Sequence, residues 1–372
     1  MELAALAKNY REFYAPAFAV RLGGADLMRK LLVAVSQVEV DLMLGAASRF
    51  TFSVTECYSH KLQTFRSGRG ADLLQMLAFG AEVEICLGYG DASSMPVALS
   101  GMITEISTNF PEGGSPELTI AGYDHGFPLT LGKNSNTWPG ARDSDAAHRI
   151  ASFYNLKASI ETTSEVHPQI EQNQESDWEF LKKLADRNQL ADRNHFEIYV
   201  DERRTLHFGT PNDKAAAVVK LVYGEGLLSF KPEANLAGQI SRVEVYGWDT
   251  RMKKPIIGVA STGDDSKGTS AIQYLNAFVR EPGKRPTLRL RQPVFTQAEA
   301  DQRAKAALSE RARQFLTGEG EAIGLPELRP DRTVELANLG DPFSRTYYIQ
   351  QATHKIDANG YRTRFKVKET RL

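Results

Sequence analysis

Alternating apolar and polar positions dominate the first third of the chain. This alternation predicts six strands, because every second side chain of a strand points to the same face. The strands cover residues 17–22, 33–42, 50–54, 82–87, 98–107 and 117–123. One helix is predicted over residues 71–79, with Gly80 in the C-cap position. Six short strands with one helix fit a closed or nearly closed β-barrel, since curling a sheet removes its exposed edges.

The pattern changes in the middle of the chain, where helical spacing appears. Helices are predicted over residues 144–155 and 176–188. The second begins with a capping box, in which Ser176 and Glu179 each satisfy a backbone N–H of the other. Apolar residues then follow at spacings of three and four, which gives this helix one buried face. Residues 126–200 are therefore expected to form a mixed α/β region.

Strand patterns return towards the C-terminus, interrupted by one long helix. A second capping box, from Thr296 to Glu299, opens a helix of about 20 residues. The predicted strands cover residues 196–200, 205–208, 218–222, 240–248, 256–260, 333–336, 346–352 and 361–367. The expected fold is mainly β, with two β-barrels around an α+β insert and a long C-terminal helix. The expected domains are residues 1–130, 131–215 and 216–372, the last with an inserted loop and a helix at about 296–316.

Two local sequence features call for an interpretation of their own. Residues 184–188 recur as residues 190–194, and six residues turn a helix by about 600°, so the two copies point about 120° apart. A local duplication that lengthens the helix or its exit loop is favoured over a functional charged patch. Residues 263–268 have the glycine spacing of a phosphate-binding loop, but Thr269 stands where that loop needs lysine, which favours a surface loop.

Composition narrows the possible classes of function. The 372 residues include 45 Lys and Arg against 46 Asp and Glu, a net charge of −1, which argues against a protein that grips nucleic-acid backbone. Cys57 and Cys86 are too few for a disulfide framework and are expected to be buried thiols in a reducing compartment. The apolar run at residues 3–7 is shorter than a signal peptide needs, and no stretch approaches the roughly 18 apolar residues of a membrane span.

The search for chemistry yields no catalytic, cofactor-binding or metal-binding residue. Glu175, Asp177 and Glu179 surround a helix start, which favours a capping role over acid–base catalysis. Asp124 and Asp249 each follow a glycine and an aromatic residue, an echo that turn chemistry explains. No Gly-x-Ser-x-Gly elbow is present. The histidines show no metal-ligand spacing; they are His60, His125, His148, His167, His195, His207 and His354.

Several segments in a fixed order carry a family resemblance. The most specific is residues 171–185. The others are residues 82–89, 99–106, 116–124, 243–249 and 347–349, with His354, Gly360, Tyr361 and Thr363. Together they resemble the phage late control protein D family, the baseplate hubs of contractile tails, similar to the hub portion of type VI secretion spike proteins. The likeness runs from about residue 15 to the C-terminus. Two departures are the extra residues 189–194 and Asp331, which follows Pro330 where glycine is more usual.

The resemblance implies a structural protein with no enzymatic activity, cofactor or metal. It implies a homotrimer whose subunits each contribute two tail-tube-like barrels, so that three chains present pseudo-sixfold symmetry to a hexameric tail tube. It also implies a trimeric spike on the opposite face, expected to be a separate polypeptide because 372 residues leave no room for a fused one. Further implied partners are baseplate wedge proteins and a tape-measure protein, without membrane or sequence-specific nucleic acid.

The same resemblance implies synthesis in the bacterial cytoplasm and assembly into the baseplate of a virion tail or phage-tail-like particle. A phage, a tail-like bacteriocin and an extracellular injection machine all stay open. One alternative function is a tail-associated peptidoglycan-degrading enzyme, which would require a cleft containing a carboxylate of raised pKa. A second alternative is a monomeric carbohydrate- or nucleic-acid-binding barrel, which would require an exposed aromatic platform flanked by basic residues.

Overall fold

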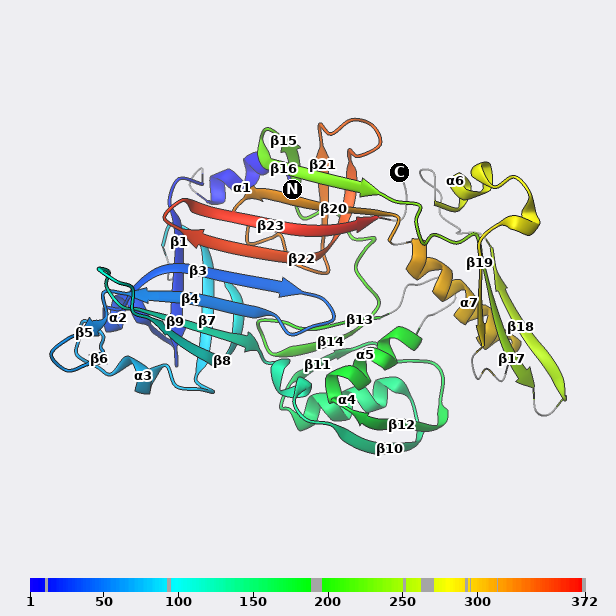
Figure 1. Cartoon of the computed structure of the whole chain (residues 1–372), viewed down its shortest axis with the longest axis horizontal. Coiled ribbons are helices and arrows are strands. Elements are labelled where there is room, and N and C mark those ends of the chain that lie inside the picture. The colour runs from blue at the N-terminus through cyan, green and yellow to red at the C-terminus, as the bar shows by residue number, and fades with distance from the viewer. Residues whose placement is uncertain are drawn as a thin grey trace.

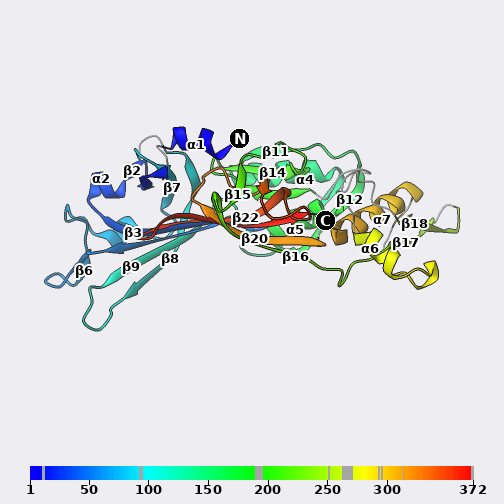
Figure 2. The ribbon, with the colours of Figure 1, turned by 90° about the horizontal axis from the view of Figure 1, so that it is seen from above.

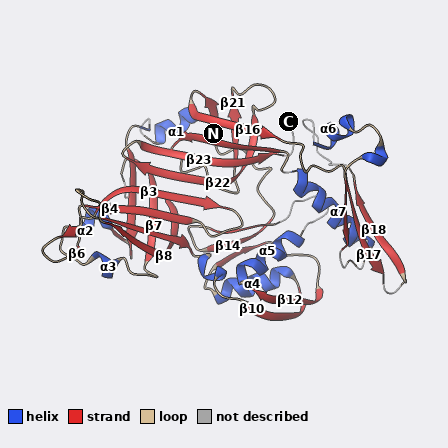
Figure 3. Ribbon diagram, in the orientation of Figure 1, coloured by secondary structure: helices blue, strands red, loops and turns tan. Residues whose placement is uncertain are grey.

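A computed structural model describes residues 1–10, 13–91, 95–188, 196–249, 252–261, 271–291, 294, 296–312 and 314–369. Thirteen strands join in one large sheet, and shorter sheets extend from it. Figure 3 shows the long strands β3, β22 and β23 in the middle of the molecule, while the helices and the shorter sheets with β10, β12, β17 and β18 lie around them.

The first barrel is a strongly curled sheet with the strand order β1-β7-β8-β9-β4-β3. Phe50 and Phe52 lie fully buried in its core, because they alternate with outward-facing residues along one strand. No ladder between β1 and β3 is described, so hydrogen bonds do not close this barrel among the described strands. The bounds of the strands are β1 Pro16–Leu22, β2 Ala25–Asp26, β3 Ala34–Met43, β4 Arg49–Thr55, β5 Tyr58–Ser59, β6 Thr64–Phe65, β7 Glu82–Tyr89, β8 Val97–Asn109 and β9 Glu117–Asp124. The helices are α1 Leu3–Asn9, α2 Leu27–Leu31 and α3 Leu73–Met76.

The second barrel is fully closed by its ladders. Its strands follow the order β22-β21-β15-β16-β20-β23, and β23 pairs again with β22. Tyr347, Phe365 and Leu6 lie in its core, so helix α1 packs on the second barrel although it begins the chain. The bounds are β15 Lys220–Tyr223, β16 Gly226–Ala234, β20 Leu316–Ile323, β21 Thr333–Ala337, β22 Arg345–Asp357 and β23 Gly360–Glu369.

A single long strand joins the two barrels. The first part of β22 pairs with β21, and its second part pairs antiparallel with β3 of the first barrel. Both partners lie on the same edge of β22, while β23 occupies the other edge. Figure 1 shows the result as neighbouring strands β16, β20, β23, β22, β3 and β4.

The mixed insert lies beside both barrels with a core of its own. Helices α4 and α5 pack against two small sheets, β10-β12 and β11-β14-β13. Ser176 and Glu179 form the predicted capping box at the start of α5. The bounds are β10 Asn134–Ala141, α4 Asp143–Phe153, β11 Lys157–Ile160, β12 His167–Glu175, α5 Asp177–Arg187, β13 Glu197–Val200 and β14 Thr205–Gly209. A 3-10 turn, η2 Phe127–Thr130, leads into it.

A fourth unit projects from the end of the second barrel, as the view from above in Figure 2 shows. It consists of a three-stranded sheet, β18-β17-β19, covered on one face by α7. The strands predicted over residues 240–248 and 256–260 therefore form this sheet and do not enter a barrel. The bounds are β17 Arg242–Asp249, β18 Lys254–Ala260, α6 Ala271–Phe278, β19 Thr287–Arg291 and α7 Gln297–Ala312, with a 3-10 turn η3 Pro282–Lys284.

The predicted fold class is confirmed: the chain is mainly β, with two barrels, an α+β insert and a helix near the C-terminal end. Three details of the prediction were wrong. The helix predicted over residues 71–79 is reduced to α3, which Asp72 caps. Helices α1 and α2 were not predicted in the same region. Helix α7 spans 16 residues, so it is shorter than expected.

The domain boundaries at 130/131 and 215/216 stay a proposal. Among the described residues there are four large hydrophobic clusters, one in each barrel, one in the insert and one under α7, and a small fifth cluster of Ala19, Cys86 and Met95. None of the helices in the described ranges combines the length and the apolar character needed to cross a bilayer.

Candidate functional site

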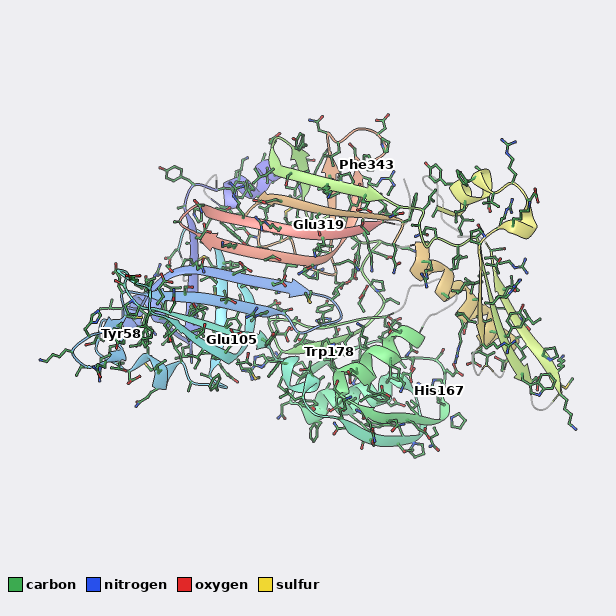
Figure 4. All side chains as sticks on the ribbon, in the orientation of Figure 1. Tyr58, Glu105, His167, Trp178, Glu319 and Phe343 are labelled. Carbon is green, nitrogen blue, oxygen red and sulfur yellow. The ribbon has the colours of Figure 1, made fainter. Side chains whose placement is uncertain are left out.

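One face of the large sheet crosses both barrels without a break, and we call it the polar face. Its eight strands follow the order β8-β9-β4-β3-β22-β23-β20-β16. Residues directly opposite one another in a ladder point to the same face. One row across six strands consists of Ser229, Glu321, Arg364, Thr353, Asp41 and Arg49. A second row consists of Arg362, Lys355, Glu39, Thr51, Ala121 and Glu105. Figure 4 labels Glu105 and Glu319, which lie on strands towards opposite ends of this face.

Charges of opposite sign alternate along the polar face. Arg362 and Arg364 of β23 both contact Glu321 of β20, at 3.0 and 3.2 Å. At the other end Arg49 contacts Glu105 at 2.8 Å. None of the large apolar side chains described as exposed lies on β3, β4, β9, β20, β22 or β23. The centre of this face is therefore hydrated and close to neutral, and it offers no apolar patch.

Hydrogen bonds tie the middle of the polar face together where the two barrels meet. The Asp41 carboxylate on β3 accepts from Gln351 Nε2 at 2.8 Å and from Thr353 Oγ1 at 2.8 Å, both on β22. These bonds cross the ladder that joins the barrels. They add side-chain contacts to the backbone pairing at the seam.

The polar face ends in an unpaired strand edge on each side. Strand β8 pairs with β7 only as far as Met102, so its residues 105–109 pair on one side only among the described ladders. Strand β16 pairs with β15 only at Gly226 and Leu227, so residues 229–234 pair only with β20. Pro232 lies in this stretch and is typical of an edge strand. Open edges of this kind can pair with another chain.

Aromatic side chains fill the junction behind the polar face. Tyr89 of the first barrel packs on Phe13, with ring centroids 5.2 Å apart, and on Tyr361 of the second barrel at 5.6 Å. The Tyr89 hydroxyl donates to the Gly324 carbonyl at 2.8 Å, and burial raises its pKa. The Tyr10 hydroxyl donates to Glu327 at 2.6 Å. The segment after β20 is thus held to both barrels.

A buried histidine organises the same segment. His354 lies within 3.0 Å of the Leu328 carbonyl through Nε2, while Nδ1 is 3.0 Å from the Tyr361 hydroxyl and 3.1 Å from Thr363 Oγ1. Thr363 Oγ1 accepts from the Leu325 N–H at 3.1 Å. This pattern fits a neutral ring that donates from Nε2 and accepts at Nδ1. Burial, assisted by the positive charge of Arg329, lowers the pKa of His354 to about 3.

The insert is joined to the first barrel by polar contacts around Gly45. Trp178 Nε1 at the start of α5 donates to the Gly45 carbonyl at 3.0 Å, and the Gly45 N–H donates to the Ile198 carbonyl at 2.8 Å. Nearby, the Asp124 carboxylate accepts from two backbone N–H groups, at 2.7 Å each. Burial raises the pKa of Asp124 to about 7, although both hydrogen bonds favour its charged form.

The insert is joined to the second barrel by Asp331. The Asp331 carboxylate accepts from Tyr199 and Asn212 of the insert side, at 3.2 and 2.5 Å, and from Tyr348 of β22 at 2.9 Å. Its φ angle of +60° is one that glycine adopts more easily, which agrees with the glycine expected there from the family resemblance. The side chain thus supplies an anchor that glycine would lack.

The carboxylates considered for catalysis have structural partners. Glu175 pairs with Lys183 at 2.5 Å, and Glu179 Oε2 accepts from the Ser176 N–H at 2.8 Å. Asp177 accepts from Gln172 Nε2 at 2.7 Å and from the Tyr154 hydroxyl at 2.7 Å. These contacts support the capping interpretation of the trio. They leave the three carboxylates without a common acid–base arrangement.

Asp124 and Asp249, which each follow a glycine and an aromatic residue, lie at turns, as expected. Asp124 accepts from the Gly126 N–H, and Asp249 accepts from the Met252 N–H at 2.9 Å. His125, next to Asp124, contacts Ser100 Oγ at 3.2 Å, and burial lowers its pKa to about 4. This contact is a buried hydrogen bond between β8 and the end of β9.

The structure describes both cysteines and six of the seven histidines. Cys57 and Cys86 are free and buried, as predicted. Within the described ranges, no group of three or more His, Cys, Asp or Glu side chains is close enough to hold a metal ion. His195, the second copy of the duplicated segment at residues 190–194 and the loop at residues 263–270 lie outside the described residues.

Comparison with family models gives one match, to the Alg8 N-terminal domain, over residues 24–358. The chain belongs to this family. No curated protein matches the sequence. The match covers the insert, the projecting unit and most strands of both barrels, but not β1 or β23.

Solved structures share the whole fold at low sequence identity. A tail protein from Neisseria meningitidis MC58 is 14% identical with a TM-score of 0.70, covering 96% of this chain and 97% of that chain. The 43 kDa tail protein of prophage MuSo2 from Shewanella oneidensis is 13% identical with a TM-score of 0.71, covering 96% and 99%. An Escherichia coli type VI secretion component, similar to the T4 tail proteins gp27 and gp5, is 10% identical with a TM-score of 0.53, covering 94% and 76%. The fold is therefore one that phage tail proteins adopt.

Sequence reasoning did not find the polar face. Its signal is the run of alternating charges in residues 360–369, where Arg362, Arg364, Lys366 and Lys368 point away from the core. Acidic residues alternate in the same way with small residues along β20. The pairing of β20 with β23 places these charges opposite one another. This pairing follows from the barrel topology, which a single sequence does not reveal.

Proposed function

We propose that this chain is a structural component of a contractile tail or contractile injection system and forms its baseplate hub. The observation that carries the proposal is the polar face, which runs across two side-by-side barrels and ends in an open edge on each side. The likeness of the whole fold to phage tail proteins supports it. The narrower assignment to the late control protein D family is part of the same proposal.

Three copies arranged head to tail would use both open edges. The edge of β8 at residues 105–109 in one copy would lie against the edge of β16 at residues 229–234 in the next. Such contacts are heterologous and close into a ring when the rotation allows it. Three chains with two barrels each would present six barrels, which matches the symmetry of a hexameric tail tube.

The alternating charges of the polar face suit the inner wall of such a ring. A wall without apolar patches or a single sign of charge would hold a passing molecule only weakly. In this arrangement the tail tube docks on one rim and a spike protein on the other. Baseplate wedge and tape-measure proteins are further proposed neighbours. The chain would be made in the bacterial cytoplasm and would work as part of the assembled particle, without catalytic residues.

Light scattering on the purified chain tests the trimer. Three copies of the 41.2 kDa chain give about 124 kDa. Co-purification with the tube and spike proteins from the same gene cluster tests the adaptor role. A 41.2 kDa monomer that also fails to co-purify with either protein would refute the proposal. Clearing of peptidoglycan in a zymogram by the purified chain would instead favour the enzymatic alternative.

A further inference from the structure

A cleft of about 440 Å³ opens in the insert between strand β10 and helix α4. Its size falls in the range of about 300–1,000 Å³ that is usual for small-molecule sites. It lies within the insert and away from the strands of the polar face, so the proposed hub function does not account for it.

The two walls of the cleft follow from local periodicity. Asn134, Asn136 and Trp138 alternate along β10 and so point to one side of the strand. Arg149 and Phe153 lie four residues apart on α4 and so share a helix face. Figure 1 shows α4 beside the two-stranded sheet of β10 and β12. The cleft is thus bounded by carboxamides and an indole on one side, and by a guanidinium and a phenyl ring on the other.

A fixed carboxylate lies at the bottom of the cleft. Asp177 is buried and accepts from Gln172 Nε2 at 2.7 Å, from the Tyr154 hydroxyl at 2.7 Å and from Asn134 Nδ2 at 3.2 Å. Because three side chains hold it, this carboxylate keeps its position without a ligand. It also orients the Asn134 amide, whose Oδ1 points away from the carboxylate as an acceptor.

One exposed aromatic ring and a guanidinium are available for contact in the cleft, whereas the Trp138 ring stacks on Phe180 with ring centroids 6.3 Å apart. Phe153 is 78% exposed, although the side chain is large and apolar. Arg149 lies over the Trp138 ring, 5.6 Å from its centroid, and no hydrogen bond or ion pair is described for it in this part of the chain. The buried Trp138 Nε1 has no hydrogen-bond partner among the described residues. An exposed planar ring such as Phe153, beside amide and guanidinium groups, can stack on the apolar face of a pyranose ring while those polar groups bond its hydroxyls.

We propose that this cleft binds a saccharide. A single-stranded nucleic acid also stacks on aromatic rings, but its backbone requires a basic groove. Arg149 is the cation that lines the cleft, and it shares the cleft with the Asp177 carboxylate. Hydroxyl groups, which both donate and accept, fit this mixture of donors and acceptors better than phosphates do. The second sequence-based alternative expected an exposed aromatic platform flanked by basic residues in a barrel, whereas this cleft lies in the insert and has one exposed aromatic ring, Phe153, beside Arg149.

Titration of the full chain tests the proposal. The probes are chitohexaose, cellohexaose, maltohexaose and a dodecathymidylate, each followed by saturation-transfer NMR and calorimetry. We expect one of the three hexasaccharides to bind, and the substitutions Phe153→Ala and Arg149→Ala each to weaken that binding about tenfold or more. Both side chains are exposed, so the fold should survive. Phe278→Ala removes a similarly exposed phenyl ring on α6, outside the cleft, and should leave binding unchanged.

Three results would overturn the proposal. The first is that none of the hexasaccharides binds at millimolar concentration. The second is saccharide binding that neither Phe153→Ala nor Arg149→Ala weakens, because the ligand then lies elsewhere. The third is binding of the oligonucleotide alone with sensitivity to both substitutions, which would make the cleft a nucleic-acid site. None of these results depends on the oligomeric mass of the chain, so none of them would refute the hub proposal.

Discussion

Protonation of His354 should destabilise the chain in mild acid. The ring is buried at the junction of the barrels, and its pKa is lowered from 6.5 to about 3, first by burial and then by the charge of Arg329. A histidine whose pKa is depressed in the folded state contributes its full stability above the unfolded pKa. That stability is lost as the pH falls from about 6.5 towards about 3, because the unfolded chain binds the proton more readily.

The size of the effect follows from the two pKa values. At about pH 4.5 the unfolded imidazole is almost fully charged, while the folded ring stays neutral. Two pH units below the unfolded pKa correspond to about 2.7 kcal/mol at 1.36 kcal/mol per unit. Asp124 and His125 also have shifted pKa values, so the wild-type curve alone does not isolate His354.

Comparison with His354→Gln isolates this contribution, because the other groups titrate in both proteins. Glutamine can donate to the Leu328 carbonyl and accept from Tyr361, but it does not titrate. We expect wild type to be the more stable at about pH 7.5, and this advantage to shrink by about 2.7 kcal/mol at about pH 4.5 in urea denaturation. His60→Gln, at an exposed position, is the matched control. An advantage of His354 that stays constant between the two pH values would refute the reasoning.

Three further predictions concern packing, capping and the sheet edge. Gly122→Ala should cost about 3 kcal/mol or more in thermal unfolding, because its Cβ would overlap the Met102 carbonyl; Gly283→Ala, in open space, should be tolerated. Ser176→Ala should lower stability by about 1 kcal/mol in urea denaturation through loss of the N-cap, and an unchanged midpoint would contradict this. Single proline substitutions at Ser107 and Thr108 should abolish the 124 kDa species where the N–H faces away from β9, without lowering the melting temperature; a trimer in both variants would exclude pairing through this edge.

The strands that the sequence predicted well are those with one buried face. Residues 50–54 and 361–367 alternate apolar with polar side chains, and the structure has strands β4 and β23 there. Period-two patterning is a local property of the chain, so it can be read without knowledge of the fold. The capping box at Ser176 is local in the same sense and was also predicted.

The strands that were missed lack this signal for identifiable reasons. Strand β20 carries Gly318 and Gly320 at its inward positions, where the rings of Phe230 and Phe365 leave no space for a Cβ. Those glycines resemble a turn in the sequence. Strands β10 and β12 are mostly exposed, so their pairing depends on the ladder and not on a buried face.

The candidate sites could not be predicted because they depend on long-range pairing. The polar face exists because β22 pairs with β3 across about 310 residues of sequence, as in the bond from Gln351 to Asp41. The cleft in the insert likewise brings β10 against α4, and its buried carboxylate comes from α5. Asp331 was noticed as an unusual residue, but its partners Tyr199 and Tyr348 were not foreseeable from spacing.

The ion pairs of the polar face contribute little to stability, and they fit the proposed hub role. Arg364, Lys366 and Glu319 are more than half exposed, and exposed pairs of this kind contribute about 0–1 kcal/mol each. The closed second barrel already buries its apolar residues on the opposite side of the same strands, so its stability does not require charges here. Alternating charges do prevent apolar adhesion and avoid a strong field of one sign. The near-zero net charge of the chain therefore has a spatial counterpart, a neutral and hydrated face that continues from one barrel into the next.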